Sequence, residues 1–174
     1  MSERRDRFTP ALRLALLVTA LLTAADAASA APGTTGPSGQ PIPRFVALGA
    51  NEVNMRAGPD RKYPVEWVYR RRGMPVEVLQ EYGIWRRIRD VEGVQGWVNG
   101  HLLSGERGAI VVGQTRLLRV RPDDGAPGVW RVEPGVVARI VLCEGPWCQL
   151  NIGGKSGWIR REEFWGSYPD ENFD

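Results

Sequence analysis

Two stretches of this chain carry the same order of aromatic, glycine and proline residues, and this internal repeat limits the possible folds more than any other feature. Residues 44–105 and 109–168 align along their length, with one-residue slips between the matching blocks. Six of the seven Trp residues form three pairs in this alignment: Trp67 with Trp130, Trp85 with Trp147, and Trp97 with Trp158. Because the matches keep their order, we interpret the two stretches as divergent copies of one small unit.

Each copy shows the pattern of short strands joined by turns. Residues 76–79 and 139–142 are runs rich in β-branched side chains that lead into turns, and residues 85–89 alternate apolar and polar side chains. The Gly153-Gly154 pair is typical of a two-residue hairpin turn. No long stretch of either copy has helical periodicity. We therefore predict an all-β chain with two tandem small barrels.

The N-terminal segment, residues 1–30, has the three parts of a secretory signal peptide. A basic segment at residues 4–7 precedes an uncharged apolar run at residues 14–25, and small residues follow at 28–30. The apolar run is too short to span a bilayer as a helix. The alternative is a membrane anchor that is not cleaved. We predict an exported protein, periplasmic or secreted, with no membrane span after cleavage.

Two further segments have compositions that do not build a core. Residues 31–43 are rich in Pro, Gly, Ser and Thr, which predicts a flexible linker after the signal peptide. Residues 169–174 form a short acidic tail, which we expect to be frayed. The predicted domains are therefore the first copy at 44–105 and the second at 109–168.

A set of spaced residues marks a motif in the first copy. They are Asn54, Arg56, Gly58, Pro59, Gly73, Val76, Val78, Trp85, Gly96, Trp97 and Val98. With this motif the chain resembles the bacterial SH3-like (SH3b) domain family, and its run over residues 63–78 is similar to exported two-copy SH3-like proteins once grouped as a domain of unknown function. The resemblance implies small β-barrels of the cell envelope, and such modules often target enzymes to peptidoglycan or its peptides. The second copy departs from the motif, since Arg121 stands where the first has Gly58.

The only two Cys residues, Cys143 and Cys148, flank a turn in the second copy. In a hairpin they would face each other across the strands, within bridging distance. Metal ligation would need further ligands, and none are spaced nearby. For an exported chain we predict a structural disulfide between them and no metal site.

The sequence offers no residue pattern for catalysis. His101 is the only His, and it follows an Asn-Gly pair at the end of the first copy. No signature pairs a nucleophile with a base. We interpret His101 as a surface turn residue, and we predict a protein without catalytic residues or cofactor that is not an enzyme.

The candidate ligand-binding residues precede Gly73 in the first copy, in the region where SH3-like folds commonly present a ligand groove. They are Tyr63, Trp67, Tyr69, Arg70, Arg71 and Arg72. Such aromatic side chains are frequent interface anchors. The alternative is that the aromatic residues pack the barrel and the arginines are solvated. Of the other Trp residues, Trp97 and Trp158 are expected in the core. Trp85 and Trp147 start a strand after a turn and are expected to be half exposed.

Charge is distributed unevenly between the copies. Residues 44–103 carry ten Arg and Lys against seven Asp and Glu, whereas residues 104–174 carry nine against ten. The basic excess favours anionic envelope polymers or acidic peptides as partners. Nucleic acid is disfavoured, because the protein is exported and lacks a nucleic-acid-binding motif. We predict a tandem SH3-like module that recognises cell-wall peptide or peptidoglycan. The alternative is an envelope adaptor that binds another protein and has no cell-wall ligand.

Overall fold

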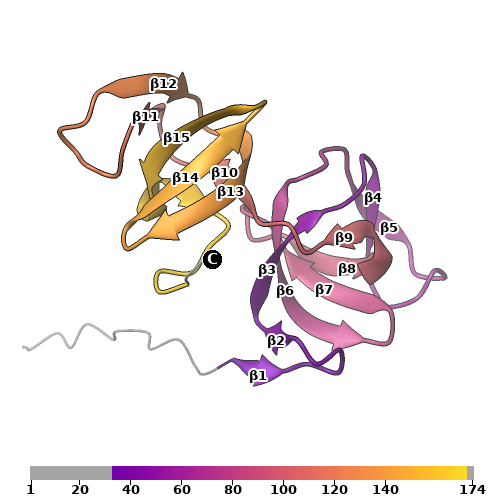
Figure 1. The fold of residues 1–174 in the computed structure, drawn as a ribbon. Coiled ribbons are helices and arrows are strands. Elements are labelled where there is room, and N and C mark those ends of the chain that lie inside the picture. The colour runs from indigo at the N-terminus through magenta and orange to yellow at the C-terminus, as the bar shows by residue number, and fades with distance from the viewer. Residues whose placement is uncertain (1–32, 172–174) are drawn as a thin grey trace, which may run out of the picture. The chain divides into compact units, whose positions relative to one another are not determined.

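The computed structural model describes residues 33–171, which belong to one compact unit. The predicted signal peptide at residues 1–30 lies outside the described residues. The described chain consists of strands, turns and two short 3-10 helices (Figure 1). None of its helices is long and apolar enough to cross a membrane.

The first copy folds into a seven-stranded antiparallel sheet, the first domain. Its elements are β3 (Arg44–Leu48), β4 (Val53–Arg56), β5 (Val65–Tyr69), β6 (Pro75–Tyr82), β7 (Trp85–Arg89), β8 (Gln95–Asn99), η1 (Gly100–Leu102) and β9 (Leu103–Ser104). The strand order is β5-β4-β8-β7-β6-β3-β9. Long hairpins join β4 to β5, β6 to β7 and β7 to β8.

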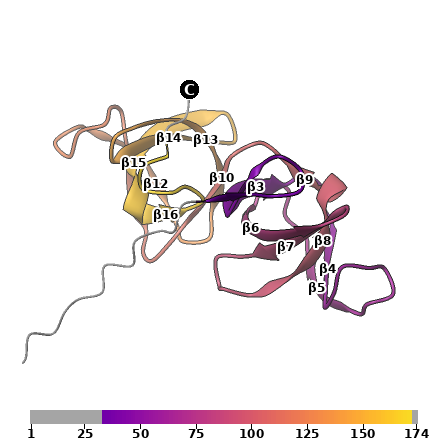
Figure 2. The same cartoon turned by 90° about the horizontal axis from the view of Figure 1, so that it is seen from below.

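The second copy, the second domain, repeats this arrangement element by element. Its elements are β10 (Gly108–Val111), β11 (Arg116–Arg119), β12 (Gly128–Val132), β13 (Val137–Glu144), β14 (Trp147–Ile152), β15 (Lys155–Arg160), η2 (Arg161–Glu163) and β16 (Phe164–Trp165). The strand order is β12-β11-β15-β14-β13-β10-β16, which is the order of the first domain. The predicted all-β fold with two tandem SH3-like copies is therefore confirmed. Figure 2 shows each sheet curling around its own interior.

Each domain has its own apolar core. The first core consists of Leu48, Val53, Met55, Tyr69, Val76, Val78, Ile88 and Val98. The second consists of Ala109, Val111, Leu118, Val132, Ala138, Ile140, Cys143, Cys148, Leu150, Ile159 and Phe164. Burying these side chains removes apolar surface from water in each domain separately, at roughly 25 cal/mol per Å².

One glycine turn shows how closely the copies agree. Gly73 and Gly135 both have a φ of 81°, a left-handed conformation that glycine adopts without steric cost. The N–H of Gly73 donates to the carbonyl of Leu48, and the N–H of Gly135 donates to that of Val111, each at 2.8 Å. The turn that leads into the longest strand of each domain is thus fixed in the same way.

Part of the predicted flexible linker at residues 31–43 has regular structure. β1 (Thr34–Thr35) and β2 (Pro41–Ile42) pair as a short antiparallel hairpin. The turn between them is tied to the first domain, because Ser38 donates from its N–H and its hydroxyl to the carboxylate of Glu81, at 2.8 and 2.7 Å. The composition of residues 31–43 does not predict this contact, because Glu81 is 43 residues away from Ser38 in the sequence.

The C-terminal tail, predicted to be frayed at 169–174, is held at Glu171. The Glu171 carboxylate forms an ion pair with Arg107, and Nη1 of Arg161 donates to the carbonyls of Tyr168 and Glu171 at 2.7 and 2.8 Å. Trp165, the one Trp without a partner in the repeat, meets the ring of Phe45 edge to face with centroids 4.8 Å apart. Trp165 thus has a packing role that the first copy lacks.

Candidate binding surface

One arginine anchors the loop between β4 and β5 in the first domain, and another anchors the equivalent loop between β11 and β12 in the second. Arg56 donates from Nη1 to the carbonyls of Tyr63 at 2.8 Å and Arg61 at 3.2 Å. In the second domain Arg119 donates in the same way to the carbonyl of Ala126, also at 2.8 Å. The arginine of the motif therefore shapes this loop in both domains, which a pattern of spaced residues alone does not reveal.

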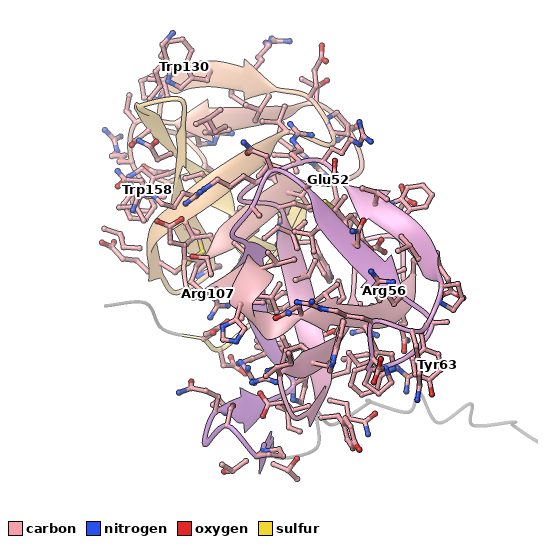
Figure 3. All side chains as sticks on the ribbon, turned by 90° about the vertical axis from the view of Figure 1, so that its right-hand side faces the viewer. Glu52, Arg56, Tyr63, Arg107, Trp130 and Trp158 are labelled. Carbon is pink, nitrogen blue, oxygen red and sulfur yellow. A yellow bond between two sulfur atoms is a disulfide. The ribbon has the colours of Figure 1, made fainter. Side chains whose placement is uncertain are left out.

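Tyr63 projects from this loop in the first domain. Its ring lies against Gly58, where a Cβ atom would stand only 2.6 Å from two ring carbons. Tyr63 keeps 39% of its surface exposed, and Figure 3 shows it beside Arg56 at the outer side of the domain. The second domain has Arg121 and buried Ala126 at these positions, so the exposed aromatic ring is specific to the first domain.

Trp67 lies on β5, the edge strand that follows the same loop, and is 55% exposed. Its ring meets that of Tyr69 edge to face, with centroids 6.4 Å apart. Tyr63 and Trp67 are therefore both accessible to a ligand, as the hypothesis of an aromatic recognition surface requires.

Tyr69 does not belong to that surface. It is only 4% exposed, and its hydroxyl donates to Oδ2 of Asp90 at 2.8 Å. Burial, followed by the hydrogen bond to Asp90, raises the pKa of Tyr69 far above its ordinary value. The sequence placed Tyr69 among the ligand-binding residues, whereas the structure places it in the core.

The arginine triplet is exposed but does not act as one group. Arg70 lies 3.8 Å from the carboxylate of Glu52. Arg71 donates from Nη1 to the carbonyl of Gly135 at 2.7 Å. Arg72 is exposed. Arg71 is therefore engaged with the backbone of the second domain, which leaves Arg70 and Arg72 as the better candidates for contacting an anionic ligand.

A buried carboxylate cluster in the first domain was not predicted. Glu81 has a fully buried side chain, and its carboxylate lies 2.8 Å from Nη2 of Arg44 and 3.1 Å from Nε of Arg86. Burial would raise the pKa of Glu81, but the hydrogen bonds from Ser38 and Arg44 and the charge of Arg86 outweigh it and lower the pKa to about 2. Glu81 is thus shared by two arginines, and its negative charge offsets part of the positive charge of Arg86.

The predicted disulfide is present. Cys143 and Cys148 face each other in the β13–β14 hairpin and are joined, with their Cα atoms 4.0 Å apart. In the β6–β7 hairpin of the first domain, the equivalent facing pair is Glu81 and Arg86. A covalent link in one domain thus occupies the place of a buried ion pair in the other.

The Trp expectations are met only in part. Trp158 is buried, as predicted. Trp85 and Trp147 were expected to be half exposed but are 8% and 7% exposed. Trp97, expected in the core, is only half-buried, because it alternates on β8 with inward-facing Gly96 and Val98.

His101 is an exposed residue of η1. Its backbone N–H donates a hydrogen bond to Oδ1 of Asn99 at 3.0 Å. Residues 33–171 contain no group of three His, Cys, Asp or Glu side chains that could hold a metal ion.

Several solved structures are similar to this chain. They include NlpC2 from Trichomonas vaginalis (14% identity, 75% of this chain and 51% of that chain, TM-score 0.35). NlpC1 from the same organism is 16% identical over 79% of this chain and 52% of that one, with a TM-score of 0.34. An NlpC/P60 family protein from Bacillus cereus is 13% identical over 71% and 57%, with a TM-score of 0.32. The chain therefore spans about half the length of the structures it matches.

The family comparison agrees with the duplicated fold. No curated protein matches the chain. The pattern of the family described as "Bacterial SH3 domain" matches it twice, over residues 49–105 and 113–166. These two matches cover most of the chain and coincide with the two seven-stranded sheets, so the protein belongs to the bacterial SH3 domain family.

Proposed function

We propose that this protein is an exported, non-enzymatic binding module that recognises cell-wall peptide or peptidoglycan through its first domain. The observation that carries the proposal is the joint exposure of Tyr63 and Trp67 on the β4–β5 hairpin. Membership of the bacterial SH3 domain family supports a cell-wall component as the class of ligand.

Aromatic rings that are exposed to water gain free energy when a ligand covers them. Tyr63 and Trp67 each offer a large apolar area on an ordered strand or loop, and rigid aromatic rings lose little conformational entropy on binding. Arg56 already fixes the loop through two carbonyl contacts. A ligand would therefore meet a preorganised surface, which lowers the entropy cost of association.

The charges around the aromatic pair support an anionic or carboxylate-bearing ligand. Lys62 lies 5.7 Å from the centroid of the Tyr63 ring, and Arg70 and Arg72 are exposed beyond β5. Long-range attraction by such charges speeds encounter with peptidoglycan stem carboxylates and weakens as salt rises. Arg86 and Arg89 contribute less, because they pair with Glu81 and Glu77.

The test is co-sedimentation of the purified protein with sacculi at low and moderate salt. We expect Tyr63→Ala and Trp67→Ala each to weaken retention by ~10-fold or more, the effect of losing an interface anchor. The matched control is Tyr82→Ala, which removes an aromatic ring that is 65% exposed at the β6–β7 turn. Retention of this control should equal that of the unchanged protein.

The same experiment separates the cell-wall ligand from a protein partner. Soluble muropeptides should compete with sacculi for the protein if the ligand is the cell-wall peptide. Absence of sacculus binding, together with co-purification of one defined envelope protein that depends on Trp67, would replace the proposal with the adaptor function.

A further inference from the structure

The second domain contains a small cavity that reaches its core. The cavity has a volume of about 200 Å³ and is lined by Leu118, Trp130, Arg131, Val132, Ile152 and Lys155. Leu118 and Val132 are core residues, and Ile152 packs against the core. This volume is below the ~300–1,000 Å³ of pockets for drug-sized ligands, so the cavity is sized for one side chain.

A comparison of the two domains explains why the cavity exists. Strand pairing aligns Val132 with Tyr69 and Ile152 with Asp90. In the first domain the Tyr69 ring fills this place, and its hydroxyl is bonded to the Asp90 carboxylate at 2.8 Å. The second domain has Val132 and Ile152 there, two apolar side chains that cannot form that hydrogen bond. Val132 is shorter than the tyrosine at the equivalent position, so it does not extend across this part of the second domain.

The rim of the cavity is cationic. The Lys155 ammonium lies 4.1 Å from the centroid of the Trp130 ring, a cation–π contact, and Arg131 also lines the cavity. Trp130 is 41% exposed on the edge strand β12, where Figure 3 labels it. An apolar floor below two positive charges matches a group that is apolar at one end and anionic at the other.

We propose that the second domain binds the terminal residue of a peptide, with its aliphatic side chain in this cavity and its free carboxylate against Lys155. The side chain contacts Val132 and Ile152 above the buried Leu118, and it lies beside the Trp130 ring. The carboxylate accepts from the ammonium, a charge-assisted hydrogen bond. This site differs in position and in chemistry from the Tyr63 and Trp67 surface, and it does not depend on that surface being a ligand site.

The probe is N-acetyl-leucine, which carries both groups, titrated into isotope-labelled protein and followed by the indole N–H signal of Trp130 and the methyl signals of Ile152. N-acetyl-leucinamide is the neutral counterpart. We expect saturable shifts with the acid and binding of the amide that is weaker by ~5-fold or more, because the amide lacks the charge that Lys155 recognises.

The two Lys residues of the chain supply a matched pair of variants, since each lies over an aromatic ring. Lys155→Gln should weaken binding of the acid to the level of the amide, whereas Lys62→Gln should leave it unchanged. Both changes are on the surface and remove the same charge. Equal affinity of acid and amide, or equal effects of the two variants, would overturn the proposal.

A second variant tests the cavity itself. Val132→Tyr with Ile152→Asp introduces the pair that fills the first domain, and it should abolish binding of N-acetyl-leucine. Shifts that persist in this folded variant, or that are absent in the unchanged protein, contradict the proposal. Tyr63→Ala and Trp67→Ala should not alter the titration, so failure here and failure of sacculus binding are read independently.

Discussion

The ring of Tyr63 rests on Gly58 so closely that a Cβ atom at residue 58 would lie 2.6 Å from ring carbons. Gly58 is buried beneath the ring, whereas Arg121 occupies its place in the second domain. The family motif therefore includes a glycine whose missing side chain positions an exposed aromatic ring.

Gly58→Ala should displace the Tyr63 ring. Its expected effects are shifted ring proton signals for Tyr63, weaker sacculus retention, and a loss of ~1 kcal/mol or more in the free energy of unfolding from the forced overlap. Gly105→Ala is the control, because a Cβ there meets nothing within 4 Å. Unchanged Tyr63 ring signals in Gly58→Ala would show that the ring does not contact residue 58 as closely as described.

Glu81 should make the unfolding free energy of the first domain depend on pH in the acidic range. Its pKa is about 2 in the folded protein and 4.5 without the fold, so its contribution is complete above the higher value and is lost as pH falls toward the lower one. The difference corresponds to ~3 kcal/mol. Urea unfolding of Glu81→Gln between about pH 5 and pH 2 should therefore show a shallower fall in stability than the unchanged protein. Glu66→Gln, at an exposed position on β5, should retain the full slope.

The disulfide should stabilise the second domain. Replacing both Cys143 and Cys148 with Ser should lower its unfolding free energy by about 2 kcal/mol, the value for closing a short loop in the unfolded chain. Thermal unfolding of this variant should match that of reduced unchanged protein. Thiol titration of the protein purified without reductant should find no free thiol, and two titratable thiols would contradict the bridge.

Equivalent Trp residues should differ in their contribution to stability. Trp158 is 8% exposed, whereas Trp97 is only half-buried. Trp158→Ala should cost ~3–5 kcal/mol, as expected for a large buried aromatic ring, and Trp97→Ala clearly less. Denaturant unfolding of the two variants provides the comparison. Equal losses would mean that exposure is not what sets their contribution.

The repeat predicted the fold because turn residues and strand residues recur at the same intervals in both copies. Turn glycines such as Gly73 and Gly135 recur at fixed distances from Trp and Val positions, and short-range chemistry dictates what happens there. The facing Cys143 and Cys148 followed from the same reasoning, since a hairpin fixes which residues are opposite.

Side-chain direction was harder to predict, because bulges interrupt the alternation of a strand. The pairing of β6 with β7 shifts between Val78 and Gln80, so Glu81 faces inward and Trp85 is buried. Tyr69 is buried and Trp67 exposed, although they are two residues apart on β5, since only the end of this edge strand reaches the core. The cavity near Trp130 is lined by residues of four strands, β11, β12, β14 and β15, which no local pattern brings together.

The β1–β2 hairpin lies outside the repeated sequence but belongs to the folded first domain. The duplicated pattern begins at residue 44, but two hydrogen bonds to the buried Glu81 carboxylate come from Ser38. A protein shortened to the repeat boundary would keep the carboxylate and lose two of its three hydrogen bonds. The folded first domain thus includes chain from outside the repeated unit, whereas the second domain has a disulfide at the equivalent place.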